Sequence, residues 1–213
     1  GLASHAEGYY TEATSNYSHS EGYRTDATNT AAHAEGYQSL ASGLYSHASN
    51  RNTTASATCA HAEGEGTSAT ADAAHSEGFQ SVASGFAAHA EGYETTASGL
   101  YSHAAGRSSA ATANSAAAIG YNLVADQENS AVVGQWNLEN QTGVLFAVGN
   151  GADDSNRSDA LQVDQMGNLT ASGSVIASGQ DLLMLIAALQ TQVDTLTAQL
   201  GALQTQLDEL GGN

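Results

Sequence analysis

The amino-acid sequence predicts a mainly β protein, a parallel β-solenoid of fourteen-residue coils followed by a small β-element and a C-terminal coiled coil. Two patterns in the first part predict the solenoid: a fourteen-residue repeat, and an alternation of small and larger residues within each repeat. Apolar residues at heptad spacing predict the coiled coil near the C-terminus. We therefore expect a ten-coil shaft at residues 1–140, a β-rich connector at 141–177 and a coiled coil at 178–213.

The repeat is marked most clearly by histidine. All eight histidines of the chain lie fourteen residues apart, and glycine and alanine recur with the same period. Equivalent positions of stacked strands are separated by about 4.8 Å, which predicts a rod roughly 45 to 50 Å long. Asn50 replaces the repeated glycine in the fourth coil, where we expect a local bulge or a looser turn.

A His-x-Glu pattern accompanies the repeat and predicts a ladder on one face. Residues two apart in a strand share a face, and the small residues between them suit the narrow inside of a coil, so His and Glu point outward. In the last two coils Ile119 and Val133 take the glutamate position, and such apolar side chains suit a packed face. We predict a subunit interface formed by this ladder: His5, Glu7, His19, Glu21, His33, Glu35, His47, His61, Glu63, His75, Glu77, His89, Glu91, His103, Ile119 and Val133.

Catalysis and metal binding are the alternative roles of the ladder. Catalysis requires one constellation of unequal partners, whereas these copies are equivalent and have no distinct nucleophile, so we expect neither enzymatic activity nor a cofactor. His and Glu are metal ligands, but no second ligand type interrupts the repeat, so we expect no metal site. The metal candidates under this alternative are His5, Glu7, His19, Glu21, His33 and Glu35. We favour an interface in which each His hydrogen-bonds a Glu, with a donor, water or ion separating the stacked carboxylates.

Other columns of the repeat have simpler expected roles. A Thr/Ser column from Thr11 to Ser109 is either an exposed ice-binding rank or a buried hydroxyl ladder, and the following alanine favours burial. Tyr9 and its equivalents follow the glycine and cover the corner of the coil, whereas Tyr17 and its equivalents form an exposed aromatic strip. Cys59 lies in this second column, and we interpret it as a filler rather than a nucleophile.

The composition limits the possible partners. The chain has 22 acidic residues against four arginines and a net charge of −18, which argues against nucleic acid or an anionic membrane surface. No apolar run approaches membrane-spanning length, so we expect no membrane insertion. The single cysteine excludes an intrachain disulfide. Because the sequence begins with Gly1 inside a repeat, we expect it to be a piece of a longer chain.

The last third begins with short strands and ends in a helix. Strands are predicted at 144–148, 160–163 and 169–175, and the "DDSN" segment at Asp153 is predicted to be a solvated turn. Ser178 and Asp181 resemble a capping box, and Gly211 and Gly212 are expected to end the helix. Neutral glutamines flank the apolar seam, so identical chains can pair without repulsion. The predicted coiled-coil core is Leu182, Ile186, Leu189, Val193, Leu196, Leu200, Leu203, Leu207 and Leu210.

Three segments resemble a known family. "NSAAAIGYNLVA", "NSAVVGQWN" and the "ASGLYSHAAG" units are similar to the YadA-like head repeats of trimeric autotransporter adhesins. The resemblance covers residues 1 to about 140, and implies a left-handed parallel β-roll that is homotrimeric about a common axis and precedes a coiled-coil stalk. The "SHAEG" form, with "VGNGADDSNRSDALQV" after it, looks more like bacteriophage tail-fibre and tail-spike proteins.

The resemblance implies a structural role outside the cell. We expect a homotrimeric tail-fibre component of a virion that contacts other tail or baseplate proteins and a host receptor. The alternative is a head-stalk fragment of a bacterial trimeric autotransporter adhesin at the cell surface, and a second alternative is an ice-binding β-solenoid. No membrane-anchor barrel follows the predicted stalk in this sequence, which departs from the pattern of a complete autotransporter.

Overall fold

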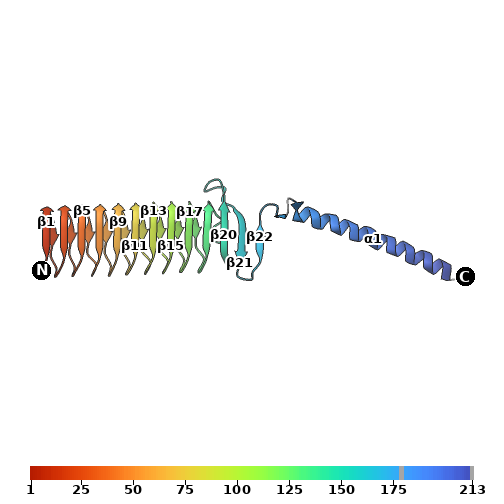
Figure 1. Cartoon of the computed structure of the whole chain (residues 1–213), viewed down its shortest axis with the longest axis horizontal. Helices are drawn as coiled ribbons and strands as arrows, with labels where there is room; N and C mark the ends of the chain where they lie inside the picture. The colour runs from red at the N-terminus through yellow and green to blue at the C-terminus, as the bar shows by residue number, and fades with distance from the viewer. Residues whose placement is uncertain (178–179, 212–213) are drawn as a thin grey trace. The chain divides into compact units, whose positions relative to one another are not determined.

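A computed structural model describes residues 1–177 and 180–211, which form two compact units, Gly1–Thr170 and Ala171–Asn213. The first unit is a β-solenoid of stacked fourteen-residue coils, as predicted, and the second contains one long helix (Figure 1). The predicted mainly β fold is therefore confirmed. Within the described residues, no helix is both long and apolar enough to cross a membrane.

Each of the first ten coils contributes one five-residue strand to a parallel sheet. In this sheet each histidine of one coil lies opposite the histidine of the next, as in the pair His5 and His19, which fixes the fourteen-residue register. The strands are β1 (His5–Tyr9), β3 (His19–Tyr23), β5 (His33–Tyr37), β7 (His47–Arg51), β9 (His61–Glu65), β11 (His75–Phe79), β13 (His89–Tyr93), β15 (His103–Arg107), β17 (Ala117–Tyr121) and β19 (Ala131–Gln135).

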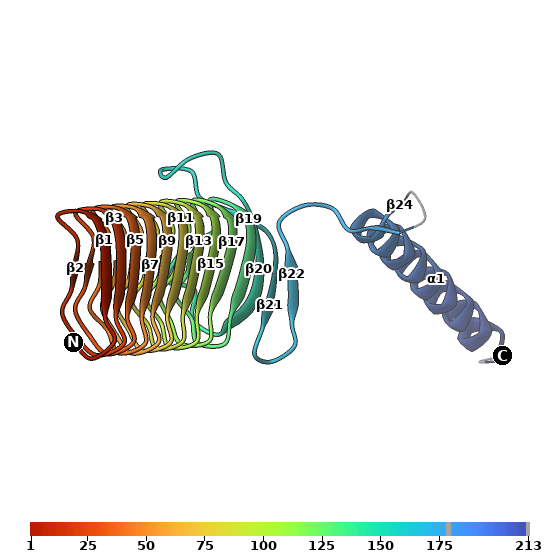
Figure 2. The same ribbon diagram turned by 60° about the vertical axis from the view of Figure 1, so that its left-hand side comes forward.

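Two-residue strands on the other side of the first nine coils form a second parallel sheet of nine strands (Figure 2). Every one of them ends in alanine, because the coil is too narrow there for a larger side chain. These strands are β2 (Glu12–Ala13), β4 (Asp26–Ala27), β6 (Leu40–Ala41), β8 (Thr54–Ala55), β10 (Ser68–Ala69), β12 (Val82–Ala83), β14 (Thr96–Ala97), β16 (Ala110–Ala111) and β18 (Val124–Ala125).

The core of the solenoid is built from small residues. Alanines such as Ala34, Ala41 and Ala55 are fully buried. From Thr25 to Ser109 the Thr/Ser column is buried as well: Thr53 donates to Ser39 at 2.9 Å, and Thr95 donates to Ser81 at 2.9 Å. The expectation of a buried hydroxyl ladder is confirmed, and these hydroxyls are not available to an ice surface.

The repeated glycine is required by close packing between coils. Gly22 has a φ of 115°, and a Cβ at this position would overlap the carbonyl oxygen of Gly36 in the next coil. In the fourth coil Asn50 adopts a φ of 81° in place of glycine, and the strands on both sides keep the fourteen-residue register. The prediction of a bulge is therefore wrong, because asparagine tolerates a positive φ and no residue is inserted, while the alternative of a looser turn stays a prediction.

The change of sequence pattern near residue 140 does not interrupt the first sheet. Strand β20 (Val144–Asn150) pairs in parallel with β19, and β21 (Asp159–Asp164) and β22 (Leu169–Ala171) continue the same sheet. Strand β20 pairs in antiparallel fashion with β21. The predicted third strand, 169–175, is shorter than expected, and the antiparallel pairing of β23 (Ile176–Ala177) with β24 (Gln180–Asp181) was not predicted.

Polar side chains organise the segment between β19 and β21. The Asp153 carboxylate accepts hydrogen bonds from the backbone N–H groups of Ser155 and Asn156, which confirms the expected turn. Arg157 forms ion pairs with Asp154 and Glu139, both at 2.9 Å, and its guanidinium lies over the Trp136 ring. Arg157 therefore helps to hold the segment between β19 and β21 on the end of the solenoid.

Helix α1 (Leu182–Gly211) begins at a capping aspartate. The Asp181 carboxylate accepts hydrogen bonds from the backbone N–H groups of Leu183 and Met184, and Ser174 donates to the same carboxylate. Asp181 was expected at the third position of a capping box, but it is the N-cap itself. Ser178, expected to be the N-cap, and Gly212, expected past the end of the helix, lie outside the described residues.

Candidate interface ladder

The His-x-Glu residues form a continuous column along the first sheet. Each His opens a five-residue strand and each Glu follows two residues later, so the pleat directs both side chains away from the coil interior. On a single chain the side chains of His33 and Glu35 are 38% and 37% exposed, which agrees with the expected outward direction. The structure therefore brings all eight histidines into one row, from His5 to His103.

The imidazole rings of this row stack on one another. Ring centroids of successive histidines are 4.7 to 5.1 Å apart, and most neighbouring rings are nearly parallel, as in the pair His75 and His89. The spacing follows from the distance between strands in a sheet. Stacking shields one ring nitrogen of most of these histidines from water.

The expected His–Glu hydrogen bond is formed at one place and is too long at the others. His103 Nε2 lies 3.2 Å from Glu91 Oε1, within hydrogen-bond distance. Elsewhere the separation ranges from 3.6 Å for His19 and Glu21 to 4.0 Å for His33 and Glu35. His103 approaches the glutamate of the preceding coil, because its own coil has Ala105 at the glutamate position.

As a result, several buried imidazole nitrogens have no hydrogen-bond partner. These nitrogens are shielded from water although the rings as a whole are partly exposed. Among the described residues, the nitrogens in question are the Nε2 atoms of His19, His33, His47, His61, His75 and His89.

Burial and interactions between neighbouring ladder residues shift the pKa values of several histidines and glutamates. Burial lowers the pKa of His47, His75 and His89, and neighbouring imidazoles lower it further. Burial raises the pKa of Glu77, and hydrogen bonding with the flanking carboxylates raises it further. Burial would also raise the pKa of Glu91, but its hydrogen bonds with Glu77 and His103 outweigh this and hold it below its ordinary value.

At the last two coils the ladder becomes apolar. Ile119 on β17 and Val133 on β19 are register neighbours, at the position that glutamate occupies in earlier coils. Ile119 is 46% exposed, so an apolar side chain faces outward there. Burying these two apolar side chains against another apolar surface would be favourable in free energy.

Two further columns run beside the ladder. Tyr9, Tyr23 and Tyr37 stack with ring centroids 5.0 to 5.2 Å apart, which agrees with a role in covering the corner. Further along the same column, towards the C-terminus, Arg51 forms an ion pair with Glu65 at 2.8 Å. The sequence analysis did not predict this ion pair, although the two residues are fourteen apart. The second column is exposed as expected, with Tyr17, Tyr45, Cys59 and Tyr101 on the surface.

Helix α1 carries its predicted apolar seam on the surface of the chain. Val193, Leu200 and Leu203 are 53%, 68% and 61% exposed. The helix is confirmed, while its association into a coiled coil stays a prediction. The other seam residues are exposed as well: Leu182, Ile186, Leu189, Leu196, Leu207 and Leu210.

Two residues with structural roles were not identified from the sequence. Asn137 is buried at the end of the short-strand sheet, and Arg157 anchors the loop described above. Asn137 occupies the Thr/Ser column of the tenth coil, so its position in the repeat was the available signal. No sequence pattern predicts the role of Arg157. Its partners Glu139 and Asn122 are 18 and 35 residues away, and Asp154 lies three residues before it in the same turn.

Comparison with known proteins gives no family for this chain. A scan against protein-family models finds no match. No curated protein sequence matches it either.

Proposed function

We propose that this chain is a non-enzymatic fibre protein that works as a homotrimer, in which the solenoid supplies reach and the helix holds three copies together. Its most suitable setting is the tail fibre of a bacteriophage or a related injection device, where it contacts other tail proteins and a host receptor. The resemblance of the "SHAEG" repeats to tail-fibre proteins supports this setting.

The observation that carries the proposal is the apolar seam of α1. Nine apolar residues follow a four-three spacing along thirty helical residues, and all nine are exposed on one chain. Burying a leucine or valine side chain is worth about 1.5–3 kcal/mol, so leaving this seam in water is costly. Pairing with identical helices removes that cost, and the uncharged glutamines beside the seam do not oppose it.

The ladder provides a second surface for the same association. It is half-exposed, is continuous over eight coils and ends in Ile119 and Val133. A closed oligomer would cover equivalent ladders of all copies at once.

Mass in solution tests the proposal. Sedimentation equilibrium of the chain should give three times 21.6 kDa at micromolar concentration. A monomer at that concentration would contradict it. A micrograph of the particle that carries the protein would then separate a phage tail fibre from the chief alternative, a bacterial surface adhesin.

A further inference from the structure

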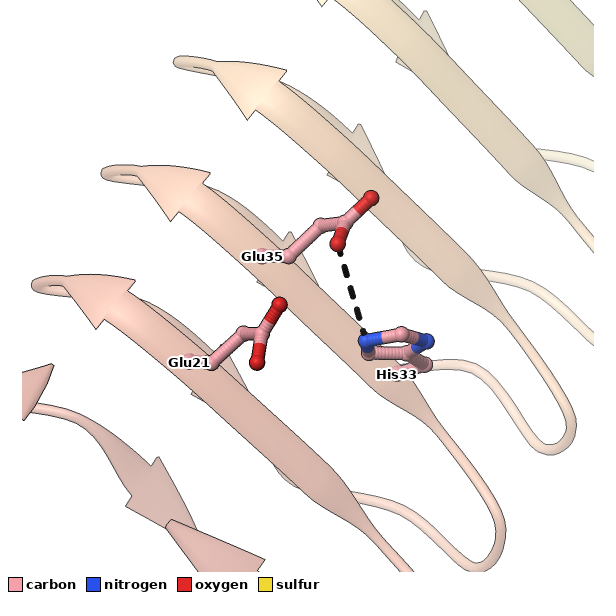
Figure 3. Close-up of side chains that lie close together, drawn as sticks. All are labelled: Glu21, His33 and Glu35. Atoms are coloured by element: carbon pink, nitrogen blue, oxygen red, sulfur yellow. Dashed lines mark ion pairs between the residues drawn. The ribbon is translucent and has the colours of Figure 1, made fainter. Parts of the chain in front are cut away.

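The ladder contains three clusters of metal-ligating side chains. In each, a glutamate of one coil meets the histidine and glutamate of the next coil, and one ligand atom of each residue lies within 4.8 Å of the others. Figure 3 shows one cluster, in which the two carboxylates and the imidazole lie together on neighbouring strands. The clusters are Glu21 with His33 and Glu35, Glu63 with His75 and Glu77, and Glu77 with His89 and Glu91.

The imidazole nitrogen in each cluster has no hydrogen-bond partner. The Nε2 atoms of His33, His75 and His89 are shielded from water, and those of His33 and His89 lie within 4.0 Å of a carboxylate oxygen of their own cluster. An unpartnered buried nitrogen costs about 1–3 kcal/mol, which a ligand would recover. The three clusters thus have a polar group without a partner at the place where a cation would bind.

The distances suit a shared cation better than a direct hydrogen bond. His33 Nε2 lies 4.0 Å from Glu35, and His89 Nε2 lies 3.6 Å from Glu77. Two ligands bound to one zinc ion at about 2.0–2.2 Å are roughly 3.3–3.6 Å apart in tetrahedral geometry. Small side-chain rotations therefore suffice to close the clusters around an ion.

Charge acts in the same direction. The clustered glutamates stack at the strand spacing on a chain of net charge −18, and like charges opposite one another in a sheet repel. A divalent cation between the carboxylates would reduce this repulsion, and the imidazole of each cluster offers it a nitrogen ligand.

We propose that the ladder binds divalent transition-metal ions of the zinc type between adjacent coils, at the three clusters. All ligands of a cluster belong to one chain, so this binding does not depend on the proposed trimer. Imidazole favours zinc, cobalt and nickel, whereas magnesium and calcium prefer sites made of oxygen alone. Because Glu77 belongs to two clusters, a chain holds two ions, or three if the Glu77 carboxylate bridges two of them.

Titration of the full chain with Co²⁺ and Zn²⁺ tests the proposal. We expect a visible Co²⁺ spectrum, displacement of Co²⁺ by Zn²⁺, and a stoichiometry of two or three ions per chain by calorimetry. A tenfold excess of Mg²⁺ should not compete. Absence of saturable Co²⁺ binding, or equal competition by Mg²⁺, would mean that the clusters hold only adventitious ions.

Glu77→Gln is the diagnostic variant, because it removes a ligand from two clusters and leaves the strand backbone unchanged. It should reduce the stoichiometry to one ion per chain. Glu94→Gln, which makes the same charge change at an exposed residue outside the clusters, is the matched control and should bind as the wild type does. Equal stoichiometry in the two variants would overturn the proposal, and metal-free circular dichroism melts of both check that each variant folds.

Discussion

At the scale of single residues, Asn137 shows how the short-strand sheet ends. Its side-chain amide accepts a hydrogen bond from the Val124 N–H at 2.8 Å and donates one to the Val124 carbonyl at 2.9 Å. In earlier coils, the backbone of the next strand makes the corresponding contacts. The asparagine therefore replaces a missing strand at the edge formed by β18, where unpaired backbone groups invite association.

Replacing Asn137 with alanine should destabilise the solenoid. The substitution leaves the part-buried N–H and carbonyl groups of Val124 without partners, and each such group costs up to about 1–3 kcal/mol. We expect a clear fall in the urea midpoint of the first unit, followed by circular dichroism. Gln165→Ala, at an exposed residue, is the control and should leave the midpoint unchanged; equal stability of the two variants would refute the capping role.

At the scale of elements, the strands and the helix obtain their stability in different ways. A strand of the solenoid is paired on both sides by its neighbours within the same chain, as β9 is by β7 and β11. Helix α1 has an N-cap and internal side-chain hydrogen bonds, such as that from Thr195 to the carbonyl of Thr191, but its seam lies in water. Most helical stability comes from packing, so the helix depends on partner helices in a way that the strands do not.

A substitution in the seam should separate the chains. Leu203→Asp places a charge at a core position, and we expect the sedimentation mass to fall from three chains towards one and the helical signal to fall with it. Gly201→Ala is the matched control, because it lies beside the seam with open space around it and replaces the poorer helix former. It should keep the mass and raise helix stability by about 1 kcal/mol. A Leu203→Asp chain of unchanged mass would show that the seam does not hold the copies together.

At the scale of the whole molecule, the His row makes stability depend on pH. The pKa values of His47, His75 and His89 are lower in the folded chain than the ordinary value of 6.5. The unfolded chain therefore takes up protons first as the pH falls below that value, and acidification favours unfolding. The groups around His75 are His61, His89, Glu63 and Glu91, and the carboxylates oppose the shift without reversing it.

We expect the free energy of unfolding to decrease between about pH 7 and about pH 5.5, the range below the ordinary histidine pKa. Urea melts in the presence of a chelator measure this without interference from metal. A variant with glutamine at positions 47, 75 and 89 should have a flatter profile over the same range. An equally steep profile in that variant would assign the pH dependence to other groups.

The prediction is confined to the histidines. In the lower pH range where carboxylates titrate, the raised pKa of Glu77 and the lowered pKa of Glu91 change the free energy of unfolding in opposite directions.

The sequence by itself determined the coil, its period and the direction of each column. A fourteen-residue repeat with small residues at alternate positions has few ways to bury its backbone, so His33 had to point outward and Thr53 inward. The heptad spacing determined the helix in the same way, because it depends only on local periodicity.

Only the tertiary structure decided which side chains meet. The His–Glu distances, the pairing of His103 with the glutamate of the preceding coil and the cap formed by Asn137 depend on the stacking of coils. Stacking distance and side-chain rotation vary by fractions of an ångström, which a repeat pattern does not encode. Those fractions distinguish a hydrogen bond at 3.2 Å from an unpartnered nitrogen at 4.0 Å.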